Sequence, residues 1–295
     1  MRVQATSSAG AGAGAASTAA ATFPGEMRRA CEAVQLASKL CVATQLVLQS
    51  NEKVSKQDDS PVTIADFAAQ AVVSYWLQQE FPGIALVAEE SAECLRDGAE
   101  GAALLWRVTD LVNQVLADAP GGGGSGPLSS AVVADLVDRG ASQGGRTGAH
   151  WILDPIDGTK GFINGRQYAI ALALMVEGEV VGGVLGCPNM PWDAVPRGAT
   201  SIPTAAPGVI FAAYKGCGTV VAPMDAAAPL EVGRFVRTHA ATSGAEATYM
   251  ESWGDSIVAD HGRTAQLAAA LGVQAPPVRI DSMAGAYTRS LFSST

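Results

Sequence analysis

Two aspartates three positions apart are the residues whose chemistry stands out first. Asp154 and Asp157 belong to the run Asp-Pro-Ile-Asp-Gly-Thr at residues 154–159, which follows the apolar stretch 150–153. The proline stiffens the backbone and the glycine permits a tight turn, so both carboxylates and the Ile156 carbonyl can converge on one point. Mg²⁺ prefers oxygen ligands, and two ions about 3.5–4 Å apart can clamp both oxygens of a phosphoryl displacement. A magnesium site is one interpretation; a turn in which both carboxylates bond local amides is the other.

The motif resembles the signature of the inositol monophosphatase-like, lithium-sensitive phosphatase superfamily. Further matching segments indicate its 3′(2′),5′-bisphosphate nucleotidase branch, in particular the plant and algal type. These segments are Asp-Ser-Pro-Val-Thr-Ile-Ala-Asp at 59–66, Glu-Glu-Ser at 89–91, Lys-Gly-Phe at 160–162, Gln-Tyr-Ala-Ile-Ala-Leu-Ala-Leu at 167–174, Gly-Cys-Pro-Asn at 186–189 and Pro-Val-Arg-Ile-Asp-Ser at 277–282. The resemblance covers about residues 26 to 284 and implies lithium sensitivity and a role in the sulfur metabolism of nucleotides.

The resemblance also implies a set of metal ligands. Glu89, Asp154 and the Ile156 carbonyl would hold a first Mg²⁺, and Asp154 and Asp157 would share a second, with two or three ions in the site. Because carboxylates and carbonyls are the oxygen donors that Mg²⁺ prefers, these residue types suit the role. Glu90 is expected to be a neighbour of the site rather than a ligand.

Two further residues carry the catalytic role in the resemblance. Water would attack phosphorus in line, and its proton would pass to Thr159, which Asp66 polarises. From the residues alone, Asp66 has a rival interpretation as the third residue of a helix that Thr63 caps, a capping box; the two roles are compatible.

Substrate contacts are expected at Gly158, Thr159, His261 and Ser282. Residues 158–161 would offer backbone N–H groups to a phosphate at the start of a helix. His261 has the alternative of a solvated histidine at a helix start. The chain departs from the family pattern after Ser282, where Met283 stands in place of a glutamine and Gly285 in place of a lysine.

The family pattern continues for several tens of residues beyond the last residue of this chain, through a Trp-Asp-x-Ala carboxylate. On that comparison we expect a C-terminally truncated chain with an incomplete second metal site. Loss of one anionic ligand of the second ion would weaken it, so the expected activity is low.

These residues must be positioned by helices and strands, which hydrophobic periodicity predicts. The segment 150–153 is expected to be a strand that Asp154-Pro155 breaks, and Thr63 is expected to be the N-cap of the second helix. The expected helices are 26–49, 63–80, 102–117 and 264–271, and the expected strands are 84–88, 150–153, a hairpin of 167–176 with 180–185, a hairpin of 209–214 with 219–222, and 278–280.

Helices first and antiparallel hairpins in the middle predict an α+β protein rather than a doubly wound parallel sheet. The resemblance specifies a layered α-β-α-β-α sandwich of the inositol monophosphatase/fructose-1,6-bisphosphatase type with an incomplete second sheet. The expected division is a disordered leader or transit-peptide remnant at 1–22, an N-terminal α+β catalytic domain at 23–207 and a partial C-terminal α/β domain at 208–295.

Composition and charge narrow the function. With 19 basic and 28 acidic residues the net charge is −9, which argues against binding to a nucleic acid polymer or an anionic membrane. The five scattered cysteines are expected to be reduced thiols. Residues 1–22 contain no acid, which is typical of chloroplast or mitochondrial transit peptides; the alternative is a disordered leader on a cytoplasmic protein.

The expected function is Mg²⁺-dependent hydrolysis of the 3′-phosphate of 3′-phosphoadenosine 5′-phosphate to AMP and phosphate. Two alternatives stay open: an inositol (poly)phosphate or sugar phosphatase, and a catalytically silent nucleotide-binding fragment of the same fold. Comparing the rates on nucleotide and inositol phosphates would distinguish the first alternative from the expected function. Binding of the nucleotide without phosphate release would indicate the second. The sequence does not specify the oligomeric state.

Overall fold

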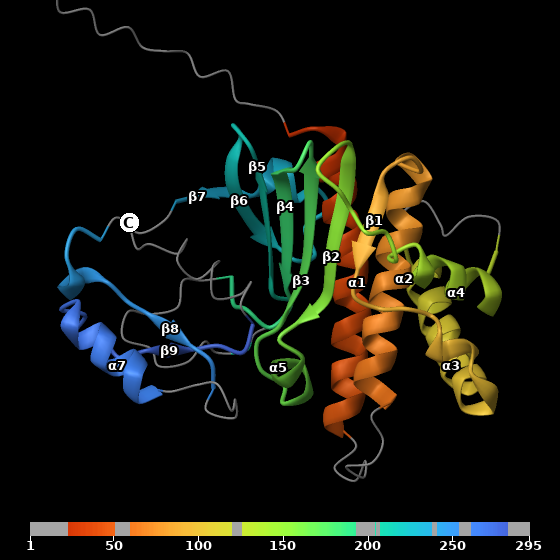
Figure 1. Ribbon diagram of the computed structural model, residues 1–295, viewed down its shortest axis with the longest axis horizontal. Coiled ribbons are helices and arrows are strands. Elements are labelled where there is room, and N and C mark those ends of the chain that lie inside the picture. The colour runs from red at the N-terminus through yellow and green to blue at the C-terminus, as the bar shows by residue number, and fades with distance from the viewer. Residues whose placement is uncertain are drawn as a thin grey trace, which may run out of the picture.

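A seven-stranded sheet forms the centre of the computed structural model, which describes residues 23–50, 60–119, 126–192, 204, 207–237, 241–253 and 261–282 (Figure 1). The strands lie side by side in chain order, β1 pairs with β2 in parallel, and every other neighbouring pair is antiparallel. They are β1 (Ala85–Ala88), β2 (Ala149–Asp157), β3 (Ala169–Val176), β4 (Glu179–Cys187), β5 (Val209–Tyr214), β6 (Gly218–Pro223) and β7 (Arg234–Val236).

Two long helices cover one face of this sheet, and a second helical layer lies outside them (Figure 1). α1 (Gly25–Ser50) and α2 (Ser60–Glu80) pack against the sheet, and α3 (Gly98–Ala117) and α4 (Ser130–Asp138) pack on α2. Most of the buried apolar side chains form one core between these layers. Short helical turns complete this part: η1 (Cys94–Arg96), α5 (Thr159–Ile163) and α6 (Pro229–Val232).

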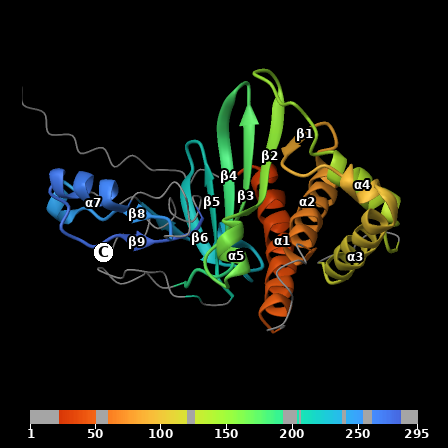
Figure 2. The same cartoon turned by 60° about the horizontal axis from the view of Figure 1, so that its bottom comes forward.

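The C-terminal part of the described chain lies on the other side of the sheet from α1 and α2 (Figures 1 and 2). It contains η2 (Gly244–Glu246), β8 (Met250–Glu251), α7 (His261–Ala270) and β9 (Val278–Arg279), with β8 and β9 paired in parallel. A second, smaller core joins this part to the sheet; Val278 and Ile280 pack there with Phe211 of β5.

Most of the expected elements are confirmed, including both hairpins and the first, third and last helices. Several boundaries differ from the expected ones, and two of these differences bear on the site. α2 begins at Ser60 and not at Thr63, because proline is tolerated in the first turn of a helix, so Thr63 is not the N-cap and no capping box joins it to Asp66. β2 also continues through Asp154-Pro155 to Asp157 instead of ending at Leu153.

The described chain contains elements that we did not expect, notably α4 and α5. Strands β5 to β7 extend the same sheet beyond residue 207, and the division at 207/208 stays a prediction. The expected leader 1–22 and the departures at 283–295 lie outside the described residues.

The helix α1 is the one described segment long and apolar enough to cross a membrane by length and composition. Half of it is buried inside the protein, where it packs on α2 and on the sheet strands β3 to β5. Core helices pass the same test, so this property alone does not indicate a membrane protein.

Candidate active site

The register of β1 on β2 brings Glu89 next to Asp154. The two strands are parallel, and Ala88 of β1 pairs with Leu153 of β2. Glu89 is the first residue after β1 and Asp154 is the next residue of β2, so the two lie side by side where β1 ends. Like-charge repulsion between them contributes to a raised pKa at Asp154, which requires that the two carboxylates be close.

A bulge in β2 brings Asp154 and Asp157 to the same side of the strand. Side chains alternate along a strand, so residues three apart would point to opposite faces. Here Asp154 pairs with Ala171 and Asp157 with Ala169, so three steps on β2 match two on β3. The extra residue restores the common face. Pro155 lies within the bulge, where the absence of a backbone N–H is tolerated.

The turn after β2 needs a glycine and leads into α5. Gly158 has φ +92° and ψ +45°, a left-handed conformation that other residues adopt at a cost. Thr159 is the first residue of α5, and its hydroxyl donates to the Ile156 carbonyl oxygen at 3.4 Å. The hydroxyl that is expected to take part in catalysis is therefore in contact with the carbonyl that is expected to bind metal.

Ser282 comes from the far end of the chain and contacts the same turn. Its hydroxyl donates to Asp157 Oδ2 at 2.6 Å, and a Cβ on Gly158 would lie 3.0 Å from the Ser282 Cα. The preceding residue, Asp281, accepts from Arg166 Nε at 2.7 Å, and Arg166 also lies over the ring of Trp253 at 5.1 Å. These contacts dock the segment after β9 onto the end of β2.

Asp66 completes the acidic site from α2. Burial raises the pKa of Asp66 to about 8, and the charges of Glu90, Glu89 and Asp154 add to the rise. Burial, Asp157 and Glu89 raise the pKa of Asp154 to about 6, although a hydrogen bond from the Ile156 N–H opposes the shift. Burial, followed by Glu89, also raises the pKa of Glu90. The sheet edge and the helix thus crowd carboxylates whose charges repel one another.

This donor set fits a divalent cation. Burial, and then mutual repulsion, raises these pKa values, and a bound cation would stabilise the ionised carboxylates against both. Mg²⁺ typically takes one or two carboxylates and completes its shell with water. Within the described residues, no three histidine, cysteine or acidic side chains converge on a single point. The expected ligand sets would place two carboxylates on each ion, Glu89 with Asp154 and Asp154 with Asp157, and the Ile156 carbonyl would complete the first set.

His261 lies in a different setting from the other expected site residues. It is the first residue of α7, and its Nδ1 lies 3.0 Å from Glu251 Oε2 of β8. Glu251 also accepts from Arg279 Nε at 3.2 Å. His261 therefore takes part in a polar cluster within the C-terminal part, and its expected substrate contact stays a prediction.

The sequence analysis did not identify the polar residues that support the site. Asn189 donates to the Gln45 side-chain oxygen at 2.9 Å and to the Arg166 carbonyl at 2.6 Å, which ties α1 to the segment between α5 and β3. Gln70 bonds the backbone of Glu90. The sequence does show Gln70 as the one polar residue in the apolar helical run 68–73, a position that the structure buries. A buried amide needs hydrogen-bond partners, so this pattern could have indicated a supporting role.

Comparison with known proteins agrees with this geometry. The model of the inositol monophosphatase family matches residues 26–253. The chain is 41% identical over 274 residues to 3′(2′),5′-bisphosphate nucleotidase 1 of Arabidopsis thaliana, covering 90% of this chain and 75% of that protein. It is 40% identical over 255 residues to 3′(2′),5′-bisphosphate nucleotidase of Emericella nidulans, covering 82% and 70% respectively.

Solved structures of low sequence identity share the fold. The extragenic suppressor protein suhB of Bartonella henselae matches with a TM-score of 0.51 at 16% identity, covering 90% of this chain and 72% of that one. An inositol monophosphatase from Zymomonas mobilis matches with a TM-score of 0.52 at 16% identity, with the same coverage of both chains. Together with the mixed sheet and its helical layers, these matches confirm the expected α+β layered fold.

Proposed function

The chain belongs to the inositol monophosphatase family of metal-dependent phosphatases, and on that premise we propose that it removes the 3′-phosphate from 3′-phosphoadenosine 5′-phosphate. The products are AMP and inorganic phosphate. The observation that carries this proposal is pairwise: the β1–β2 register puts Glu89 beside Asp154, and the bulge in β2 puts Asp154 and Asp157 on one side of the strand. The bisphosphate nucleotidases of plants and a fungus at about 40% identity support the choice of substrate.

In this proposal the acidic edge of the sheet holds Mg²⁺. Glu89, Asp154 and the Ile156 carbonyl would hold one ion, and Asp154 and Asp157 would together hold a second. Bound Mg²⁺ supplies a water of lowered pKa and offsets the negative charge of the phosphate. The acidic protein thereby binds an anionic substrate through cations rather than through a large basic surface.

The proton of the attacking water would pass to the Thr159 oxygen, and the Thr159 hydroxyl would give its own proton to the Asp66 carboxylate. The Thr159 hydroxyl already donates to the Ile156 carbonyl, so its oxygen is free to accept a second hydrogen bond. Asp66 lies on α2, where burial and the charges of Glu90, Glu89 and Asp154 raise its pKa to about 8. It accepts a proton only in its ionised form, which bound cations would favour. The Gly158 turn and the Ser282 hydroxyl bound to Asp157 border the position proposed for the phosphate.

The experiment is a side-by-side measurement of phosphate release with Mg²⁺ from 3′-phosphoadenosine 5′-phosphate, inositol 1-phosphate and inositol 1,4-bisphosphate. Chromatography of the nucleotide product identifies which phosphate was removed. We expect the nucleotide to have the highest kcat/KM and 5′-AMP to be its product. A higher kcat/KM for either inositol phosphate would overturn the proposed substrate. Calorimetric binding of the nucleotide without phosphate release would overturn the proposed activity.

A further inference from the structure

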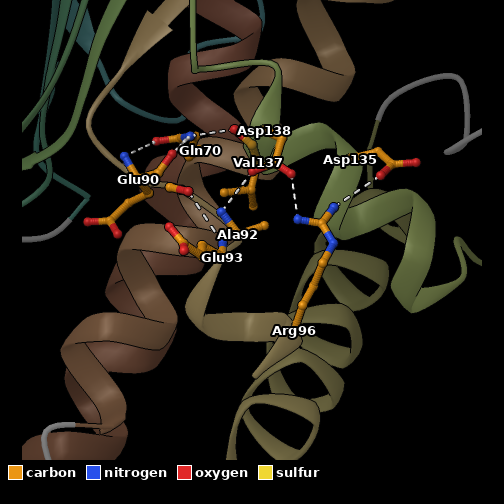
Figure 3. A network of polar contacts seen from close by, with 9 residues as sticks. Gln70, Glu90, Ala92, Glu93, Arg96, Asp135, Val137 and Asp138 are labelled. Carbon is orange, nitrogen blue, oxygen red and sulfur yellow. Dashed lines mark hydrogen bonds and ion pairs between the residues drawn. The ribbon is translucent and has the colours of Figure 1, made fainter. Parts of the chain in front are cut away.

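Gln70, a side chain outside the proposed ligand set, holds the strand end that carries Glu89 (Figure 3). The side chain is fully buried on α2. Its Nε2 donates to the Glu90 carbonyl at 2.8 Å and to the Val137 carbonyl at 2.7 Å, and its Oε1 accepts from the Glu90 N–H at 3.0 Å. The amide therefore bonds both backbone groups of Glu90, as a neighbouring strand would.

Asp138 holds the same loop two residues further on. Its Oδ1 accepts from the Ala92 N–H at 2.9 Å, and its other oxygen accepts from Arg96, which also pairs with Asp135 at 3.2 Å (Figure 3). Asp138 is the last residue of α4, where the helix dipole disfavours an acid. Its bonds to Ala92 and Arg96 offset that cost and fix the loop to α4.

The loop needs such support because of its charges. Glu89 and Glu90 follow Ala88, the last residue that β1 pairs with β2. Beyond that point the peptide is no longer held by the ladder, while repulsion from Asp66 and Asp154 acts on its carboxylates. Gln70 lies one helical turn after Asp66, so its bonds fix the loop relative to the helix that carries the proposed proton acceptor.

The packing around Gln70 leaves its amide little freedom. A Cβ on Gly140, just after α4, would lie 2.5 Å from the Gln70 Nε2 and 2.8 Å from the Ala88 Cβ. Gly140 also accepts the Ala88 N–H through its carbonyl at 2.9 Å. The residue Gly140, just after α4, thus packs closely against both the Gln70 amide and Ala88, the last residue of β1.

We propose that Gln70 and Asp138 are positioning residues that clamp the loop 89–92 and thereby set the affinity of the Glu89 site for Mg²⁺. The proposal rests on the proposed function, because it assumes that Glu89 is a ligand. Residues that orient metal ligands typically change metal affinity by about 10–100-fold when they are replaced.

The test uses the full chain with the substitutions Gln70→Met, Asp138→Ala and Asp138→Asn. Gln35→Met is the matched control: Gln35 on α1 also donates to two backbone carbonyls, of Met224 and Ala226, but beside β6, four strands from β2. For each protein we would measure the Kd for Mg²⁺ by calorimetry without substrate, the Tm, and amide hydrogen exchange in the loop 89–92.

We expect Gln70→Met and Asp138→Ala to raise the Kd for Mg²⁺ by about 10–100-fold and to speed exchange of the Glu90 and Ala92 amides. Asp138→Asn keeps the Oδ1 acceptor for the Ala92 N–H but loses the ion pair with Arg96, so its Kd should lie between those of wild type and Asp138→Ala. Gln35→Met should lower Tm without changing the Kd. If Gln70→Met and Gln35→Met both lower Tm and both keep the wild-type Kd, the clamp is only structural and the proposal is wrong.

Failure of the proposed function would be recognised separately. If the wild-type chain binds Mg²⁺, the clamp variants bind it more weakly and no protein releases phosphate from any tested substrate, the clamp is supported and the proposed activity is overturned. A wild-type chain that releases phosphate while the clamp variants keep its Kd overturns the clamp alone. A wild-type chain that does not bind Mg²⁺ overturns both.

Discussion

At the scale of single residues, the site is defined by carboxylates that the fold forces together. Burial and then the charges of Glu90, Glu89 and Asp154 raise the pKa of Asp66, and Glu89 also adds to the raised pKa values of Glu90 and Asp154. Such crowding is costly in a protein without cations, and perturbed groups of this kind cluster at functional sites. The cost of the crowding and the capacity to bind a cation therefore have the same origin.

The raised pKa of the buried, crowded Asp66 predicts how the stability of the metal-free protein depends on pH. The pKa of Asp66 is about 8 in the folded chain, against an ordinary value of 3.8, so the folded state binds this proton more tightly. The stabilisation that the proton gives is complete below about pH 4 and is lost as the pH rises through 8. In EDTA we expect Tm to fall between pH 6 and 8.5, as measured by thermal denaturation.

Asp66→Asn is the control for that slope, because asparagine cannot lose the proton. We expect a flatter pH dependence in this variant, and saturating Mg²⁺ should reduce the slope in the wild-type protein. The same slope in wild type and Asp66→Asn would show that other groups cause the pH dependence.

At the scale of elements, the sequence predicted the hairpins and long helices, because β-rich runs and helical periodicity are local signals. It did not predict that β2 continues past Pro155, since a proline normally ends a strand pairing and the bulge that tolerates it depends on β3. Gln70 was missed for a similar reason: its partners lie 20 and 67 residues away, so nothing near it in sequence reveals its role.

The resemblance assigned Glu89, Asp154 and Asp157 as metal ligands, and this role stays a prediction. The strand register explains physically why Glu89 lies beside Asp154, 65 positions away, and the bulge explains why Asp157 lies on the same side of the strand as Asp154. Thr63 shows the opposite case, because a capping pattern that looks complete in the sequence falls inside a helix whose first turn contains a proline.

The turn after β2 gives a prediction at this scale. Gly158→Ala must place a side chain at φ +92° and push its Cβ against Ser282, whereas Gly216→Ala meets a similar φ of +85° with nothing within 4 Å. The left-handed conformation alone costs about 1–2 kcal/mol. In urea unfolding we expect Gly216→Ala to lose about that amount and Gly158→Ala to lose more.

Activity separates the two glycines further. Gly158→Ala should also lower kcat/KM, because Ser282 is displaced from Asp157, while Gly216→Ala should keep the wild-type value. Equal losses of stability and activity in both variants would mean that the contact with Ser282 has no role of its own.

At the scale of the whole molecule, the C-terminal segment reaches back to complete the site. The second core joins β9 to the sheet, and the Arg166–Asp281 pair holds the residue before Ser282. The side chain of Asp281 is 6% exposed, so loss of its partner leaves a nearly buried charge. Replacing one partner of a buried pair costs up to about 3–5 kcal/mol, whereas replacing both with uncharged groups costs less.

We therefore expect Arg166→Met to destabilise the chain more than the double variant Arg166→Met/Asp281→Asn, as measured by urea unfolding. Ser282 should also lose its hold on Asp157 in the single variant, with a lower affinity for Mg²⁺. If the double variant is as unstable as the sum of both single variants, the pair does not couple the segment to the sheet.

The net charge of −9 acquires a specific meaning at this scale. An acidic protein repels a phosphorylated substrate at long range, and bound cations would offset that repulsion. This argument, the crowded carboxylates and the membership in a family of metal-dependent phosphatases support the proposed use of Mg²⁺.

The most direct test of that claim is phosphate release from 3′-phosphoadenosine 5′-phosphate by wild type, Asp154→Asn and the control Asp110→Asn. Asp110 is an exposed acid on α3 that accepts from Gln114. We predict Mg²⁺-dependent release by wild type and Asp110→Asn, abolished by EDTA, and a loss of at least about 100-fold in kcat/KM for Asp154→Asn, because the lost electrostatic stabilisation is worth several kcal/mol. Equal release by Asp154→Asn, or release that survives EDTA, would contradict the account.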